Sequence, residues 1–306
     1  MLNLREYIKE SILSGEEAVF NGDIGIKSEI EKFIEDNYKY SRFTISNKPN
    51  KDGKFVVDGI DIFVTNKKIT SLTNNLFIWG KVKGFFECAS CNSLTSLKGA
   101  PKEVGGDFDC SSCNSLTSLE GAPEKVGGFY CSFCKSLKIL EGAPGEVSRN
   151  FYCHHCYSLT SLEGAPEEVG KDFTCTYCNS LISLEGAPKK VGWSFNCSDC
   201  DSLKTLEGAP EEVGKNFNCS FCDSLKSLEG APKKVRFDFV CTMCKSLTTL
   251  EGAPEKVGRD FDCSDCESLK SLEGAPKEVG KNFDCSRNKF SIEDIEKIVK
   301  AKRIKI

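Results

Sequence analysis

The dominant feature of the sequence is a pattern of apolar positions that returns every 22 residues. In one unit the apolar positions are Phe108, Cys110, Cys113, Leu116 and Leu119, with polar residues between them. The alternation of Phe108 and Cys110 predicts a short strand whose side chains at these positions point inward. A Gly-Ala-Pro segment follows and predicts a turn, because proline lacks the amide that a helix interior needs. Each unit is therefore expected to form one turn of a stack.

Pairs of cysteines mark the repeat, and nine Cys-x-x-Cys pairs are followed by a lone Cys285. The first cysteines of successive pairs are 22 residues apart, except for one step of 21 residues between Cys110 and Cys131. One unit cannot bury its own apolar stripe, so stability must come from stacked neighbours and from caps at both ends.

The ends of the chain depart from the repeat and divide it into four segments. Residues 1–59 are expected to form an N-terminal cap of helices and strands, and residues 60–85 an irregular first repeat. The tandem repeats occupy residues 86–290. Residues 291–306 are predicted to form a capping helix, with Ser291 as its N-cap.

Within the N-terminal cap, apolar residues recur at helical spacing over residues 1–40. The first group contains Leu4, Ile8 and Ile12, and the second runs from Ile26 to Ile34. Residues 43–65 are typical of strands around a turn rich in Lys, Pro, Asn and Gly.

The unit fits the leucine-rich pattern L-x-L-x-x-N/C-x-L, whose period is roughly 20–29 residues. In this register Cys113 occupies the Asn/Cys position, and the final repeat has Asn288 there. The segment Leu-Lys-Ser-Leu-Glu-Gly-Ala-Pro-Lys-Glu-Val-Gly at 269–280 resembles uncharacterised leucine-rich-repeat proteins of phage and gut-metagenome sequences, as do residues 43–58 and 69–74. The resemblance implies an α/β repeat solenoid and transfers no activity.

In such a solenoid we expect short parallel strands on one side, turns or a single 3₁₀ turn on the convex side, and helical caps. The resemblance also implies a bacterial or phage-encoded protein of the cytoplasm. Residues 1–10 carry acidic side chains and no apolar core, which is unlike a secretory signal.

The charge and hydropathy of the chain argue against nucleic acid and membrane as partners. The net charge is −4 and no basic face is visible, so no nucleic-acid partner is expected. No apolar run approaches the roughly 20 residues that cross a bilayer, so no membrane partner is expected.

Cysteine is the unusual component, with 19 residues against two methionines and two histidines. Consecutive repeats supply Cys-x-x-Cys, an 18-residue spacer and a second Cys-x-x-Cys, a spacing typical of four-cysteine metal sites. Sulfur ligands suit zinc or iron–sulfur centres. The four sulfur atoms of two adjacent repeats are expected to form a rectangle too wide for one ion, which favours a [4Fe–4S] cluster shared by the two repeats. The sequence predicts a non-enzymatic array of such centres, for electron transfer or metal storage. The predicted ligands are Cys88, Cys91, Cys110, Cys113, Cys131, Cys134, Cys153, Cys156, Cys175, Cys178, Cys197, Cys200, Cys219, Cys222, Cys241, Cys244, Cys263 and Cys266.

The alternative is that the cysteines are core residues and hold no cofactor. Free cysteine packs as a small hydrophobe, and the final repeat replaces the second cysteine with asparagine. Redox catalysis is disfavoured in either case, because a reactive pair must be exposed and these pairs are expected to face inward. His154 and His155 are interpreted as surface residues.

Outward positions beside the cysteines vary from repeat to repeat, and aromatic residues gather in the middle of the chain. Aromatic side chains with polar neighbours are typical of interface anchors. This favours, as the alternative function, a protein-interaction scaffold with a concave aromatic face, although neutral drift would also vary these positions. The predicted partner-binding residues are Tyr130, Phe133, Tyr152, His155, Tyr177 and Phe221.

Overall fold

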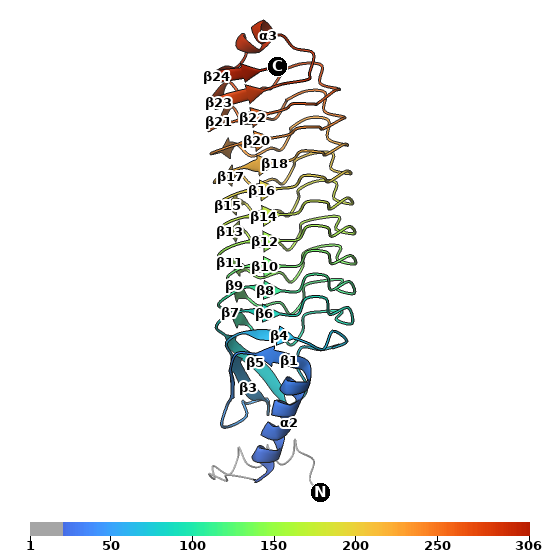
Figure 1. Ribbon diagram of the computed structural model, residues 1–306, viewed down its shortest axis with the longest axis vertical. Coiled ribbons are helices and arrows are strands. Elements are labelled where there is room, and N and C mark those ends of the chain that lie inside the picture. The colour runs from blue at the N-terminus through green and yellow to red at the C-terminus, as the bar shows by residue number, and fades with distance from the viewer. Residues whose placement is uncertain (1–20) are drawn as a thin grey trace.

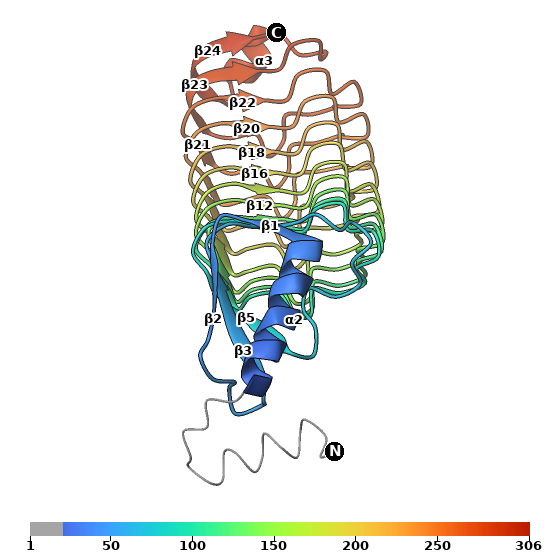
Figure 2. The same cartoon turned by 60° about the horizontal axis from the view of Figure 1, so that its bottom comes forward.

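The computed structural model describes residues 21–306, which form a long column of stacked turns (Figure 1). The chain makes one turn per repeat, and strands of consecutive turns pair in parallel register. The predicted repeat solenoid with short parallel strands is confirmed. The column runs nearly straight in both views (Figures 1 and 2). The predicted concave face is therefore one side of a straight column. No helix among residues 21–306 is long and apolar enough to span a bilayer.

The first ladder of strands begins each repeat with a buried phenylalanine. Its rings lie over one another along the column, with neighbouring centroids 5.2–5.6 Å apart. Two leucines and two cysteines per repeat complete the same continuous core. The strands are β6 (Phe86–Glu87), β8 (Phe108–Asp109), β10 (Phe129–Tyr130), β12 (Phe151–Tyr152), β14 (Phe173–Thr174), β16 (Phe195–Asn196), β18 (Phe217–Asn218), β20 (Phe239–Val240) and β22 (Phe261–Asp262).

A second ladder of strands replaces the turns or 3₁₀ turn that the sequence predicted for the other side. Each of its strands is two residues long, with a charged side chain outward and a valine buried, as in Lys256–Val257. The pattern is too short to be recognised within one repeat, since it becomes a strand only by pairing with adjacent turns. The strands are β7 (Glu103–Val104), β9 (Lys125–Val126), β11 (Glu146–Val147), β13 (Glu168–Val169), β15 (Lys190–Val191), β17 (Glu212–Val213), β19 (Lys234–Val235) and β21 (Lys256–Val257).

The outward residues of the second ladder form ion pairs between neighbouring turns. Lys125 and Glu146 are 2.8 Å apart, and Lys256 and Glu278 are 2.9 Å apart. Exposed pairs of this kind contribute little to stability individually.

The N-terminal cap closes the lower end of the column (Figure 2). Helix α2 (Asn21–Asn37) buries Ile30 and Ile34, which lie within the predicted helical segment. The predicted helix around Leu4, Ile8 and Ile12 lies outside the described residues. Strands form within the segment predicted to contain them, and β3 and β4 start the two parallel ladders by pairing with β5 and β6. The strands of this region are β1 (Tyr38–Tyr40), β2 (Phe43–Ile45), β3 (Phe55–Gly59), β4 (Ile62–Val64) and β5 (Phe77–Val82).

The C-terminal cap differs from the single helix predicted over residues 291–306. Helix α3 is only five residues long (Ile292–Glu296), although Ser291 caps it as expected. The chain then forms β24 (Lys300–Lys305), which pairs in parallel with β23 (Glu278–Asp284) as the last rung. The basic residues of β24 line an exposed strand edge, where charge discourages the addition of another strand: Lys300, Lys302, Arg303 and Lys305.

Candidate functional site

Two columns of cysteine run through the core, as the sequence predicted. Each first cysteine directly follows its strand, and each second cysteine follows the next two turn residues. Both are fully buried in the repeats, as at Cys110 and Cys113. All the cysteines are free thiols.

From the second cysteine pair onward, the second cysteine of each pair is hydrogen-bonded to the backbone of the preceding turn. From Cys113 to Cys266, its Sγ lies 3.1–3.4 Å from the carbonyl oxygen of the first cysteine of the turn before. Asn288 makes the equivalent contact in the final repeat, where its Nδ2 donates to the Cys263 carbonyl over 2.8 Å. The second cysteine thus takes the place of the ladder asparagine and satisfies a buried carbonyl.

This geometry does not favour the predicted array of metal centres. Burial raises the pKa of Cys153 and Cys175 well above the usual range, so these thiols are neutral in the absence of a bound cation. Over the described part of the chain, no group of three or more His, Cys, Asp or Glu side chains is arranged to hold a metal ion. Ligation by the cysteine pairs, whether of iron–sulfur clusters or of zinc, finds no support in the arrangement of these side chains.

Aromatic side chains form a connected surface cluster near the middle of the column. Phe133, His155 and Tyr177 come from three successive turns and stack, with both neighbouring centroid distances at 4.5 Å. We call the whole group the aromatic cluster: Tyr130, Phe133, Tyr152, His154, His155, Tyr157 and Tyr177.

The cluster contains five of the six predicted partner-binding residues. The sixth, Phe221, is exposed but lies two turns beyond Tyr177, with Asp199 at the equivalent position between them. Tyr157 and His154 also belong to the cluster, although neither was among the predicted residues. The ring of His154 lies on the surface, as predicted, and contacts Phe133 at a centroid distance of 5.1 Å.

The stacked residues occupy a backbone conformation that aromatic side chains rarely adopt. The residue before each second cysteine has a φ between 56° and 61°, including Phe133, His155 and Tyr177. Glycine, asparagine and aspartate tolerate this left-handed region best, and other residues lose about 1–2 kcal/mol there. The amides at this position still donate to the next turn, as Phe133 does to the His154 carbonyl over 2.9 Å. Every repeat has this conformation, so the stack is distinguished by its aromatic side chains and not by its backbone.

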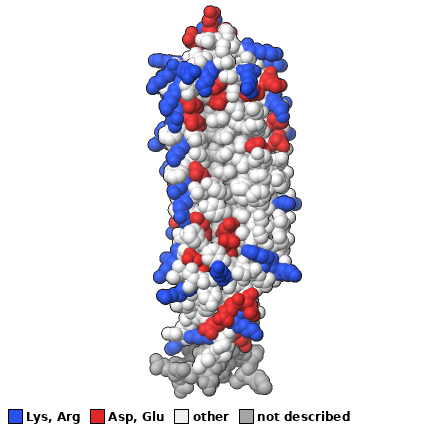
Figure 3. Space-filling model, in the orientation of Figure 1, with Lys and Arg blue, Asp and Glu red and all other residues white. Residues whose placement is uncertain are grey.

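The rings of the aromatic cluster are uncharged, although carboxylates border them, with Asp199 beside Tyr177 and Asp107 beside Tyr130. Burial, and then the neighbouring His155, lower the pKa of His154, so this imidazole is neutral at physiological pH. The Nδ1 atoms of the two histidines are 3.0 Å apart, a distance that suits a hydrogen bond when at least one ring is neutral. In the view of Figure 3, charged side chains gather along one edge and toward the ends, and the middle of the face is uncharged.

Comparisons with known proteins add little to this description. No family model matches the chain, and no curated protein matches it. Among solved structures, a leucine-rich repeat protein from Bacteroides ovatus is similar over 87% of this chain and 99% of its own, with 15% identity and a TM-score of 0.24. Because this similarity is low, the fold is described from the two ladders of strands alone.

Proposed function

We propose that this solenoid is a non-enzymatic scaffold that binds a protein partner through the aromatic cluster. The observation that carries the proposal is the stack of Phe133, His155 and Tyr177 on the surface of three successive turns. Exposed aromatic side chains gathered in one place are typical of interface anchors. Phe133 and Tyr177 keep 38% and 42% of their surface exposed, so their apolar area remains open to a partner.

The shape of the cluster favours an uncharged protein surface as the partner. The stacked rings cover one another's faces, so a partner would meet mainly ring edges together with the phenolic groups of Tyr130 and Tyr152. Such a surface suits aliphatic or aromatic side chains flanked by neutral hydrogen-bonding groups. Because thiols stay reduced in the cytoplasm, we propose that a chain with this many free cysteines acts in that compartment.

A triple substitution at the stack is expected to abolish most of this binding. Peptides would be selected by display against the immobilised wild-type chain, and their Kd values measured by calorimetry. Phe133→Ser, His155→Ser and Tyr177→Ser should together weaken binding by about 30-fold or more, the loss that accompanies removal of an interface hot spot. Serine is native at this position in Ser90 and Ser112, so the fold should tolerate it.

The matched control is Phe221→Ser with Met243→Ser. These two residues have the same backbone conformation and are exposed, but they lie outside the aromatic cluster. The control should keep the wild-type Kd within about twofold, and all variants should keep the wild-type melting profile. Selected peptides that bind the triple variant as tightly as the wild type would refute the proposal, as would an equal loss in the control.

A further inference from the structure

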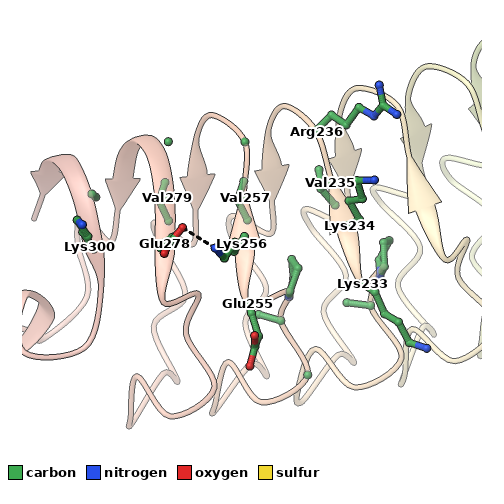
Figure 4. Close-up of a pocket in the computed structure, with 18 of the residues that line it drawn as sticks. Lys233, Lys234, Val235, Arg236, Glu255, Lys256, Val257, Glu278, Val279 and Lys300 are labelled. Atoms are coloured by element: carbon green, nitrogen blue, oxygen red, sulfur yellow. Dashed lines mark ion pairs between the residues drawn. The ribbon is translucent and has the colours of Figure 1, made fainter.

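A surface groove lies over the C-terminal turns of the second ladder (Figure 4). Its volume is about 1070 Å³, and it crosses β19, β21, β23 and β24. Ala231, Ala253 and Ala301 give it an apolar lining together with the adjacent prolines and valines. It is separate from the aromatic cluster, which is built on the turns from residue 130 to residue 177.

The groove is basic although the chain is acidic. Six of its lining residues are basic and two are acidic, whereas the chain as a whole carries a net charge of −4. In Figure 4, Lys234, Lys256, Glu278 and Lys300 form a row across successive turns. The basic lining residues are Lys233, Lys234, Arg236, Lys256, Lys300 and Lys302, and the acidic ones are Glu255 and Glu278.

Both acidic residues of the groove are already neutralised. Lys256 Nζ lies 2.9 Å from Glu278 and Lys277 Nζ lies 2.9 Å from Glu255. Hydrogen bonding and charge from Lys256 lower the pKa of Glu278, with a further contribution from Lys300. Of the six basic residues of the groove, four have no ion-pair partner within residues 21–306: Lys233, Arg236, Lys300 and Lys302.

One of these cations interrupts the repeat at the groove itself. The position after the valine of the second ladder is glycine in most repeats, as at Gly214, Gly258 and Gly280, but it is Arg236 here. A side chain on Gly258 would collide with the Arg236 carbonyl, because its Cβ would lie 1.8 Å from that oxygen. Close approach of the turns thus restricts this position, and the arginine found there lines one end of the basic groove.

We infer that this groove binds an extended, acidic segment of a polypeptide. Lys234 and Lys256 lie on adjacent strands, which are about 4.8 Å apart, and Lys300 lies two strands beyond Lys256, on the far side of Glu278. An extended peptide directs alternate side chains to opposite sides, so carboxylates can meet the lysines while apolar residues face the alanines and prolines. A single-stranded nucleic acid suits the groove less well, since none of the lining residues is aromatic and bases bind such channels by stacking.

The test measures binding of a fluorescently labelled peptide, in which glutamate and valine alternate, to the full chain by fluorescence anisotropy. The groove variant combines Lys233→Glu with Arg236→Gly, because both new residues are native at these positions in the next repeat, as Glu255 and Gly258. The control variant combines Lys98→Gln with Lys102→Glu, which changes the net charge equally at a site outside the groove. An oligothymidylate of similar length serves as the competing polyanion.

The groove variant should weaken peptide binding at least about tenfold, and the control at most about twofold. Four results would overturn the inference. The wild-type chain could fail to bind the peptide, both variants could lose binding equally, the groove variant could bind as tightly as the wild type, or oligothymidylate could bind more tightly than the peptide. The outcome is independent of the aromatic cluster, whose selected peptides should bind the groove variant normally.

Discussion

Replacing Phe195 with alanine should destabilise the solenoid by about 3–5 kcal/mol, the usual cost of removing a buried aromatic side chain. Phe195 is fully buried, and its ring stacks on Phe173 at 5.2 Å and on Phe217 at 5.6 Å. The backbone ladders fix the distance between turns, so the chain cannot close over the cavity. Urea denaturation would measure the effect as a lower midpoint.

The same substitution should make the two halves of the column unfold less cooperatively. Each turn contacts mainly its neighbours, so a defect near the middle weakens the coupling between the two halves. Hydrogen exchange should show lost protection around Phe195 before the distant turns open. Thr174→Ala, at an outward position of the preceding first-ladder strand, is the control and should change stability by about 0.5 kcal/mol or less. An effect below about 1 kcal/mol for Phe195→Ala would contradict the importance of this stack.

A single added methyl group at Gly186 should also be strongly destabilising. Gly186 has a φ of +84°, and a Cβ there would lie 2.3 Å from the backbone nitrogen of Glu163 in the preceding turn. Left-handed strain and the forced backbone shift together predict a loss of about 2–5 kcal/mol for Gly186→Ala. The readout is the free energy of unfolding from urea denaturation.

Gly145 provides the matched control, because a Cβ there would meet only the Glu124 carbonyl oxygen, at 4.0 Å. Gly145→Ala should leave stability unchanged or raise it by about 0.4–1 kcal/mol, since alanine restricts the unfolded chain. Equal destabilisation at the two sites would show that the close approach of turns does not explain the glycine at 186.

The first ladder could be predicted from sequence because the pattern that indicates each strand lies within one repeat. The alternation of Phe108 and Cys110 and the repeat length were enough to place both side chains in the core. The second ladder could not be predicted in this way, since Lys256–Val257 is a strand only through pairing with the turns above and below. For the same reason, Lys300–Lys305 could not be distinguished from the end of a helix without its partner β23.

The candidate site was predicted in part, for an equally physical reason. Alternation correctly placed Tyr130 and Tyr152 outward, but it carried no information on the left-handed turn before the second cysteine. Glycine usually marks such a turn, and here Phe133, His155 and Tyr177 occupy it. The stacking that joins these residues follows from that turn geometry and from the distance between repeats.

The metal prediction depended on spacing along the chain, which does not report what a thiol contacts. The acceptor for Cys178 is the carbonyl of Cys153, 25 residues earlier in the chain. A metal site and a ladder of hydrogen bonds both fit the same Cys-x-x-Cys spacing. The difference lies in the direction of each Sγ relative to the preceding turn.

The cysteines belong to the core, and the proposed function belongs to the surface. The most direct test of this assignment is elemental analysis of the chain purified without oxygen, combined with its visible spectrum and a titration of thiols. We expect no stoichiometric iron or zinc, no iron–sulfur absorption, and all 19 thiols reactive once the chain is unfolded. Stoichiometric zinc, or a coloured protein with iron and sulfide, would contradict the account and restore the array of metal centres.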